Sequence, residues 1–170
     1  MFYLSGPDAE VTAAALRAGG VQAEVLGGRA GQASALKMGY AGFTKGTTAL
    51  LLEITLVAHA WGFLDAILAK YASSHPEVLR LFTAHVTTWP EYAAIRAEEM
   101  VELTATAKAA GLAPSMAPGA AARVMAAMAQ LGWDTNDAMD KTARARTRPL
   151  PELIRLLAAK GLLKAPEKAE

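Results

Sequence analysis

The residues of this sequence that are best suited to chemistry lie in one stretch that is predicted to be helical. In a helix, where successive residues are rotated by 100°, its polar side chains fall on one side. These side chains are Lys37, Tyr40, Thr44, Thr48, Thr55 and His59, and Lys45 lies at the margin of the same side. A lysine near the start of a helix is not placed for the helix dipole, which favours cations at the other end. Because lysine changes its pKa readily when it is desolvated, Lys37 is a candidate for proton transfer or for anion binding. The alternative is a lysine that reaches solvent at the helix edge.

The histidines and the missing cysteines limit the other chemistry. His59, His75 and His85 have no metal-ligand spacing on a shared helix face, so we expect no metal site. The absence of cysteine excludes disulfides, thiol catalysis and cysteine-based zinc sites.

Two groups of charged residues are predicted to be solvated. The basic run Lys141–Arg148 could contact phosphate, but a solvated helix end is the commoner explanation for such a run. Glu98, Glu99 and Glu102 share a predicted helix with Arg96 and are most simply a solvated face. We therefore expect no nucleic-acid partner.

Composition indicates a folded, mostly helical protein. Of 170 residues, 53% are hydrophobic and 19% are charged, and the net charge of +1 excludes both a disordered chain and an overall basic nucleic-acid binder. Alanine, the best helix former, supplies 39 residues. The apolar window Thr47–Ala69 contains Glu53, His59 and Asp65, so it is predicted to be a buried core helix rather than a membrane span. With no signal peptide evident, we expect a cytoplasmic protein.

The first thirty residues read as strand, helix, strand. Phe2–Leu4 and Val21–Leu26 are predicted strands, and a helix over Ala9–Ala18, capped by Asp8, lies between them. Such a crossover is the building block of a parallel sheet, and two strands alone do not form a stable one. Residues 1–30 therefore look like the end of a larger α/β domain.

The rest of the chain is predicted to be an all-α domain over residues 31–163, followed by a polar tail over 164–170. Its first helix, Gln32–Trp61, contains Gly39, Gly42 and Gly46, which indicate close approach of another helix or a ligand. Glycines and prolines mark the ends of further predicted helices. Ser74 is expected to cap the helix that begins around Pro76, and the other helices are expected over 63–71, 91–110, 120–130, 134–144 and 152–160.

One junction in the sequence is similar to a known family. Residues 27–40 read GGRAGQASALKMGY, which resembles the strand-to-helix junction of the β-hydroxyacid dehydrogenase and 6-phosphogluconate dehydrogenase superfamily. The variant SALKM looks more like a poorly characterised branch with a C-terminal domain of unknown function. Upstream, LSGPDAE resembles the end of the family's Rossmann domain, and RAEEM and AAGL downstream fit its helical domain. The resemblance covers nearly the whole chain and implies that domain's multi-helix fold.

The resemblance implies roles for individual residues. Lys37 matches the family's catalytic lysine, which transfers a proton during hydride transfer. Substrate contacts are implied at Tyr40, Thr44, Lys45 and Thr48, and cofactor contacts at Gly31 and Ser34. Where family members carry histidine, asparagine, an acid and a glycine, this chain carries Tyr40, Ala41, Thr44 and Ala33. These departures make 6-phosphogluconate a poor candidate for the substrate.

The nucleotide-binding half of such an enzyme is missing from this sequence. A dinucleotide fold needs a Gly-x-Gly-x-x-Gly turn between a strand and a helix, and no such motif occurs here. We therefore expect the C-terminal domain of an NAD(P)-dependent oxidoreductase for a small hydroxy acid, incomplete without a nucleotide-binding domain or chain. The resemblance also implies a homodimer and a small-molecule substrate. Because of the charged residues in the apolar window, we expect no membrane partner. The alternative is a non-catalytic helical dimerisation module.

Overall fold

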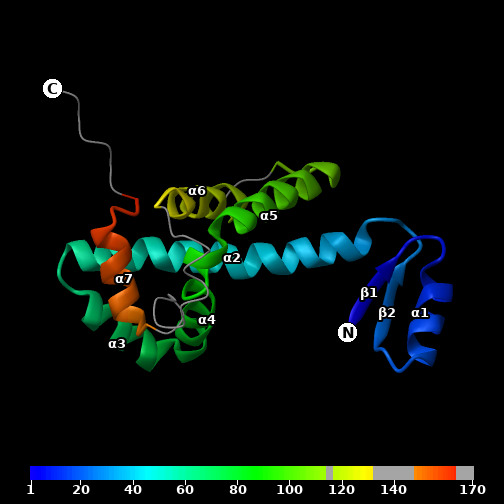
Figure 1. Cartoon of the computed structure of the whole chain (residues 1–170), viewed down its shortest axis with the longest axis horizontal. Coiled ribbons are helices and arrows are strands. Elements are labelled where there is room, and N and C mark those ends of the chain that lie inside the picture. Colours follow the sequence, from blue (N-terminus) through cyan, green and yellow to red (C-terminus); the bar gives the residue numbers. More distant parts are fainter. Residues whose placement is uncertain (114–116, 132–147, 164–170) are drawn as a thin grey trace. The chain divides into compact units, whose positions relative to one another are not determined.

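A computed structural model describes residues 1–113, 117–131 and 148–163. Within these residues the chain forms seven helices and two strands (Figure 1). It divides into two compact units, Met1–Ala41 and Gly42–Glu170, and the long helix α2 (Gln32–Ala60) contributes to both. The predicted fold class, a mainly helical domain preceded by a short β-α-β segment, is confirmed.

The first unit contains β1 (Phe2–Ser5), α1 (Ala9–Ala18) and β2 (Ala23–Gly27), followed by the start of α2. The strands are parallel, with Phe2 opposite Ala23, and the register shifts between Leu4 and Ser5. Arg17 of α1 ties the helix to the sheet, because its Nε donates a hydrogen bond to the carbonyl of Ala23 at 3.0 Å. The predicted crossover is therefore present.

Glycines end four of the helices in the same way. After α1 and α2, Gly20 and Gly62 have φ values of 78° and 78°, in the left-handed region that favours glycine. The residue after each glycine donates to a carbonyl five positions back, as in Phe63 N to Ala58 O at 2.9 Å. This is the Schellman geometry, which satisfies carbonyls that the helix leaves open. Gly111 and Gly161 end α5 and α7 in the same geometry.

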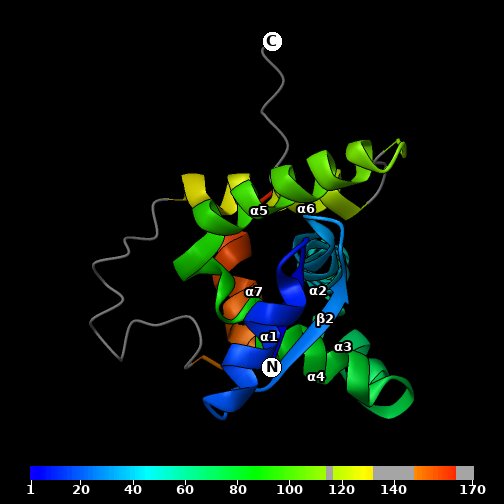
Figure 2. The same ribbon diagram turned by 90° about the vertical axis from the view of Figure 1, so that its right-hand side faces the viewer.

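In its described residues, the second unit consists of the remainder of α2 and five further helices, of which α5 and α6 run side by side (Figures 1 and 2). The five helices are α3 (Leu64–Ser74), α4 (Pro76–Val86), α5 (Trp89–Ala109), α6 (Ala117–Gln130) and α7 (Leu150–Ala159). The expected helix over 134–144 and the tail over 164–170 lie outside the described residues.

Two local predictions in this unit are wrong. Ser74 does not cap α4; it is the last residue of α3, and its hydroxyl donates to the carbonyl of Lys70 at 2.7 Å. His75 occupies the N-cap position instead, and Pro76 starts the helix with its φ already helical. The helix expected over 120–130 starts too late in the prediction, because α6 already begins at Ala117.

The core of the second unit is built from large side chains of several helices. Phe82, Trp89 and Met100 are at most 1% exposed. Part of the polar side of α2 is buried as well, since Thr48 and Thr55, like Leu52, are fully buried. No helix in the described part of the chain is long and apolar enough to cross a membrane.

Candidate functional site

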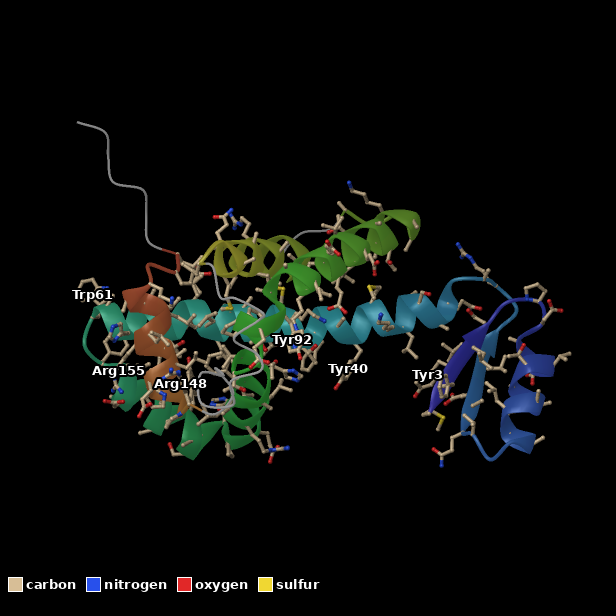
Figure 3. All side chains as sticks on the ribbon, viewed as in Figure 1. Tyr3, Tyr40, Trp61, Tyr92, Arg148 and Arg155 are labelled. Carbon is tan, nitrogen blue, oxygen red and sulfur yellow. The ribbon has the colours of Figure 1, made fainter. Side chains whose placement is uncertain are left out.

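Lys37 lies on the wall of a hollow within the first unit. The hollow has a volume of about 650 Å³, and it is lined by Met1, Phe2, Tyr3, Ala33, Ser34, Leu36, Lys37 and Tyr40. Figure 3 labels Tyr3 and Tyr40, which represent the two elements that form it, β1 and α2. Lys37 and Ser34 are both exposed, and their surroundings are mostly apolar. The structure thus brings together three of the predicted site residues, Ser34, Lys37 and Tyr40.

The glycine-rich turn before α2 sets the direction of this helix. Gly27 has a φ of 149°, and a Cβ there would lie 2.7 Å from Oε1 of Gln32. That same oxygen accepts a hydrogen bond from the backbone N–H of Arg29 at 3.2 Å. Ser5, at the end of β1, accepts a hydrogen bond from the backbone N–H of Ala33 at 3.0 Å. The first turn of α2 is therefore fixed to β1, which places Lys37 one turn further along.

The residues around this turn do not fit a dinucleotide. Binding of a pyrophosphate at a helix N-terminus needs free backbone N–H groups behind a glycine fingerprint. Here one such N–H, that of Ala33, already donates to Ser5, and Gly31 is an exposed turn residue with a φ of 91°. The described residues thus provide one wall beside Lys37 but no phosphate cradle.

The other predicted substrate residues belong to the second unit and have different surroundings. Thr44 is 5% exposed, and Thr48 is fully buried with its hydroxyl donating to the carbonyl of Thr44 at 2.7 Å. The ammonium of Lys45 pairs with Oε2 of Glu99 on α5 at 2.8 Å, and both side chains are mostly buried. Lys45 therefore links α2 to α5.

A cluster of charged residues surrounds this ion pair. Arg96 of α5 lies over the ring of Tyr92, with its Cζ 5.4 Å from the ring centroid. Its Nη1 is buried without a hydrogen-bond partner among the described residues. Burial lowers the pKa of His85 on α4, and the nearby cations Arg96 and Lys45 lower that pKa further. Chemically, the cluster offers a partly desolvated guanidinium near an imidazole whose charged form is disfavoured.

The prediction of a solvated face on α5 is wrong for two of its four residues. Glu98 and Glu102 are exposed, but Arg96 and Glu99 are half-buried. The spacing of the core residues could have shown this, because Trp89, Ala93 and Met100 are buried at helical intervals and Arg96 falls on the same side.

The remaining candidates do not gather into a site. Among the described residues no three histidines or acids lie close enough together to hold a metal ion. Of the basic run Lys141–Arg148, only Arg148 lies within the described residues, where it is half-buried. Gly42 confirms the close approach expected along α2, since a Cβ there would lie 2.6 Å from Cδ2 of Leu103.

Comparison with known proteins agrees with the predicted resemblance. Residues 58–127, all in the second unit, match the family model of DUF1932, a domain of unknown function. None of the proteins with curated functions matches the sequence.

Two solved structures share the fold. A conserved hypothetical protein from Sinorhizobium meliloti 1021 matches 93% of this chain and 51% of its own, with 28% identity and a TM-score of 0.71. A conserved protein of unknown function, described as structurally similar to 3-hydroxyacid dehydrogenases, matches 78% of this chain and 51% of its own, with 30% identity and a TM-score of 0.63. The chain thus spans about half the length of these proteins. The resemblance to the C-terminal domain of this dehydrogenase superfamily is confirmed.

Proposed function

We propose that this chain, which carries a DUF1932 domain, is the C-terminal part of an NAD(P)-dependent oxidoreductase for a small hydroxy acid or a related alcohol or carbonyl compound. The observation that supports this most directly is the hollow of the first unit, where Ser34, Lys37 and Tyr40 lie together. Its wall is mostly apolar, so a bound substrate would be partly desolvated there.

In this proposal Lys37 is the proton-transfer residue. Its amine takes the proton of the substrate hydroxyl during oxidation and returns a proton to the carbonyl oxygen during reduction. The nicotinamide supplies the hydride chemistry when it is bound. Tyr40 and Ser34 flank Lys37 by three positions on either side, so their hydroxyls are placed on the same part of the helix to hold substrate oxygens.

The proposal requires a nucleotide-binding domain beside this hollow, on the same polypeptide or on a partner chain. Two features are consistent with such a partner. The described residues contain only a two-stranded parallel sheet, and parallel sheets normally have both faces covered. The aromatic residues Phe2 and Tyr3 of β1 are 58% and 44% exposed, which leaves apolar surface for a neighbour to cover.

The test uses the assembly of this chain with its nucleotide-binding domain and follows NAD(P)H absorbance over a panel of short hydroxy acids. Lys37→Ala is expected to lower kcat by about 10²- to 10⁴-fold, the usual contribution of a general acid or base. As a control, Lys70→Ala changes an exposed lysine of α3 and should leave kcat unchanged. Retention of full activity in Lys37→Ala would exclude the proposed role.

The chain by itself gives a second readout of the same proposal. Because the described residues provide no phosphate cradle, calorimetric titration of the 170-residue chain with NADH or NADPH should show no binding below millimolar concentrations. Tight binding to the isolated chain would contradict the requirement for a separate nucleotide-binding domain.

A non-catalytic dimerisation module is the second candidate, and a row of exposed apolar residues on α2 favours it. Phe43, Leu50 and Val57 recur every seven residues and are 63%, 59% and 51% exposed. Trp61, one turn on and labelled in Figure 3, is 79% exposed. Such a seven-residue repeat is typical of a helix that pairs with another helix. We propose that two copies pair through this row, whether or not the assembly is also an enzyme.

Light scattering tests the pairing. The wild-type chain is expected at twice its monomer mass, and Leu50→Glu at the monomer mass, because a charge in the row would be buried without a partner. Val101→Glu places the same charge at a 66% exposed position on α5 and should leave the dimer intact. A wild-type monomer at micromolar concentration would exclude the dimer.

A further inference from the structure

A second hollow, in the helical unit, has a composition unlike that beside Lys37. It has a volume of about 590 Å³, within the range of small-molecule sites. It is lined by residues from the C-terminal end of α2, the middle of α6 and the end of α7. All of its lining residues belong to the second unit, and none belongs to the proposed proton-transfer site.

The floor of this hollow is apolar and well buried. Leu56 of α2, Val124 of α6 and Leu162 after α7 are 9%, 4% and 5% exposed. Leu162 is held there by the Schellman motif that ends α7, in which its backbone N–H donates to the carbonyl of Leu157 at 3.0 Å. The floor therefore suits a hydrocarbon or aromatic group.

The rim carries charges of both signs. Glu53 and His59 come from α2, and Arg123 comes from α6. None of the three has an ion-pair or hydrogen-bond partner among the described residues, whereas three other charged pairs of this unit are already formed: Lys45 with Glu99, Arg80 with Glu77, and Arg155 with Asp65. His59 lies in the last turn of α2, at the negative end of the helix dipole.

The backbone at the edge of the hollow is strained. Leu163, which lines it, has a φ of 59°, and it is the one non-glycine residue with positive φ among the described residues. A side chain in this conformation costs free energy, and such residues gather at sites that clamp ligands. This observation is independent of the charges on the rim.

From these features we infer that the hollow binds a zwitterionic amino acid with a large apolar side chain. The carboxylate of the ligand pairs with the guanidinium of Arg123, which is suited to bidentate carboxylate binding. The ammonium lies toward the carboxylate of Glu53, and the apolar side chain packs on Leu56, Val124 and Leu162. This site goes beyond the proposed oxidoreductase function and does not depend on it.

Calorimetric titration of the full chain with three matched compounds tests this site. L-phenylalanine carries both charges, L-phenylalaninamide lacks the carboxylate, and 3-phenylpropionate lacks the ammonium. We expect saturable binding of phenylalanine and at least about tenfold weaker binding of the other two, as is usual when one charge-assisted contact is lost.

Two variants assign the charges to residues. Arg123→Gln should remove the preference for phenylalanine over its amide, and Glu53→Gln should remove the preference over 3-phenylpropionate. Both positions are exposed, so the fold is expected to tolerate the changes, and circular dichroism checks this. Arg80→Gln and Glu98→Gln, at exposed positions outside the hollow, serve as matched controls and should bind like the wild type.

The inference is overturned by any of three results. These are no binding of phenylalanine at millimolar concentration, equal binding of the three compounds, or unchanged preferences in both variants. Because the titration measures binding without turnover, none of these outcomes bears on the role of Lys37.

Discussion

The two units of this chain differ in whether they bury large apolar side chains in a core. In the second unit, Phe82 and Trp89 are 1% exposed, and the buried set includes methionines and leucines from α5, α6 and α7. In the first unit, Phe2, Tyr3 and Leu36 are 58%, 44% and 43% exposed, and the buried apolar residues are small apart from Met38. The second unit has a core of its own, whereas the first consists of a backbone framework around very little core.

This difference shows what holds each unit together. The second unit is stabilised by burial of side chains, at about 1.5–3 kcal/mol for each large residue. The first relies on the parallel pairing of β1 with β2, the contact of Arg17 with Ala23 and the capping of α2 by Ser5. We infer that its apolar surface is the part that a nucleotide-binding domain would cover.

The strongest test of this comparison uses one residue type in both units. Phe82→Ala is expected to lower the free energy of unfolding by about 3–5 kcal/mol, because it leaves a cavity in a packed core. Phe2→Ala removes the same ring from an exposed strand and should change that free energy by less than about 0.5 kcal/mol. Urea unfolding followed by circular dichroism measures both. A comparable loss for the two variants would show that the first unit contains an equally packed core.

Much of the fold could be predicted from the sequence because local signals and tertiary packing agree. The glycines at 20, 62 and 111 end their helices where expected, since only a residue that tolerates positive φ completes the Schellman geometry. Ser74 was misjudged because its position resembles a cap, but its hydroxyl reaches back to Lys70. A serine hydroxyl between two helices can accept from an N–H of the following helix or donate to a carbonyl of the preceding one. Which bond forms depends on where the preceding helix ends.

The candidate site was less predictable than the fold. The grouping of Lys37 with Ser34 and Tyr40 follows from helical spacing, but their position beside β1 depends on the hydrogen bond from Ala33 to Ser5, 28 residues away in sequence. Helical spacing also placed Thr48 on the polar stripe, yet it lies in the core, because periodicity alone does not say which side of a helix is buried. The pairing of Lys45 with Glu99 depends on packing between helices and could not be read from either segment.

Two glycines of α2, one in each unit, extend the comparison of packing to smaller effects on stability. A Cβ at Gly39 would meet no atom within 4 Å, so Gly39→Ala should stabilise the chain by about 0.5–1 kcal/mol through helix propensity alone. A Cβ at Gly42 would lie 2.6 Å from Cδ2 of Leu103, and Gly42→Ala is expected to be neutral or to cost up to about 2 kcal/mol. Thermal unfolding of the two variants gives the sign of each effect.

The Leu103→Ala background separates propensity from packing. Once the leucine side chain is shortened, Gly42→Ala should become stabilising by about the same 0.5–1 kcal/mol as Gly39→Ala, because only the helix propensity remains. If Gly42→Ala is stabilising in the wild-type background as well, then α2 and α5 do not pack closely at this point.

The smallest expected effect concerns pH and the polar cluster of the second unit. Burial and the cations Arg96 and Lys45 lower the pKa of His85 in the folded chain below its ordinary value of 6.5. Between the two values the unfolded chain binds a proton that the folded chain does not, so stability is fully present above about pH 6.5 and falls as the pH drops through this window. His85→Gln should flatten the change in the urea midpoint between about pH 7 and pH 5, whereas His75→Gln, at an exposed position on the N-cap of α4, should leave it as in the wild type. An unchanged slope in His85→Gln would mean that other groups of the chain, rather than the His85 imidazole on α4, take up the proton on unfolding.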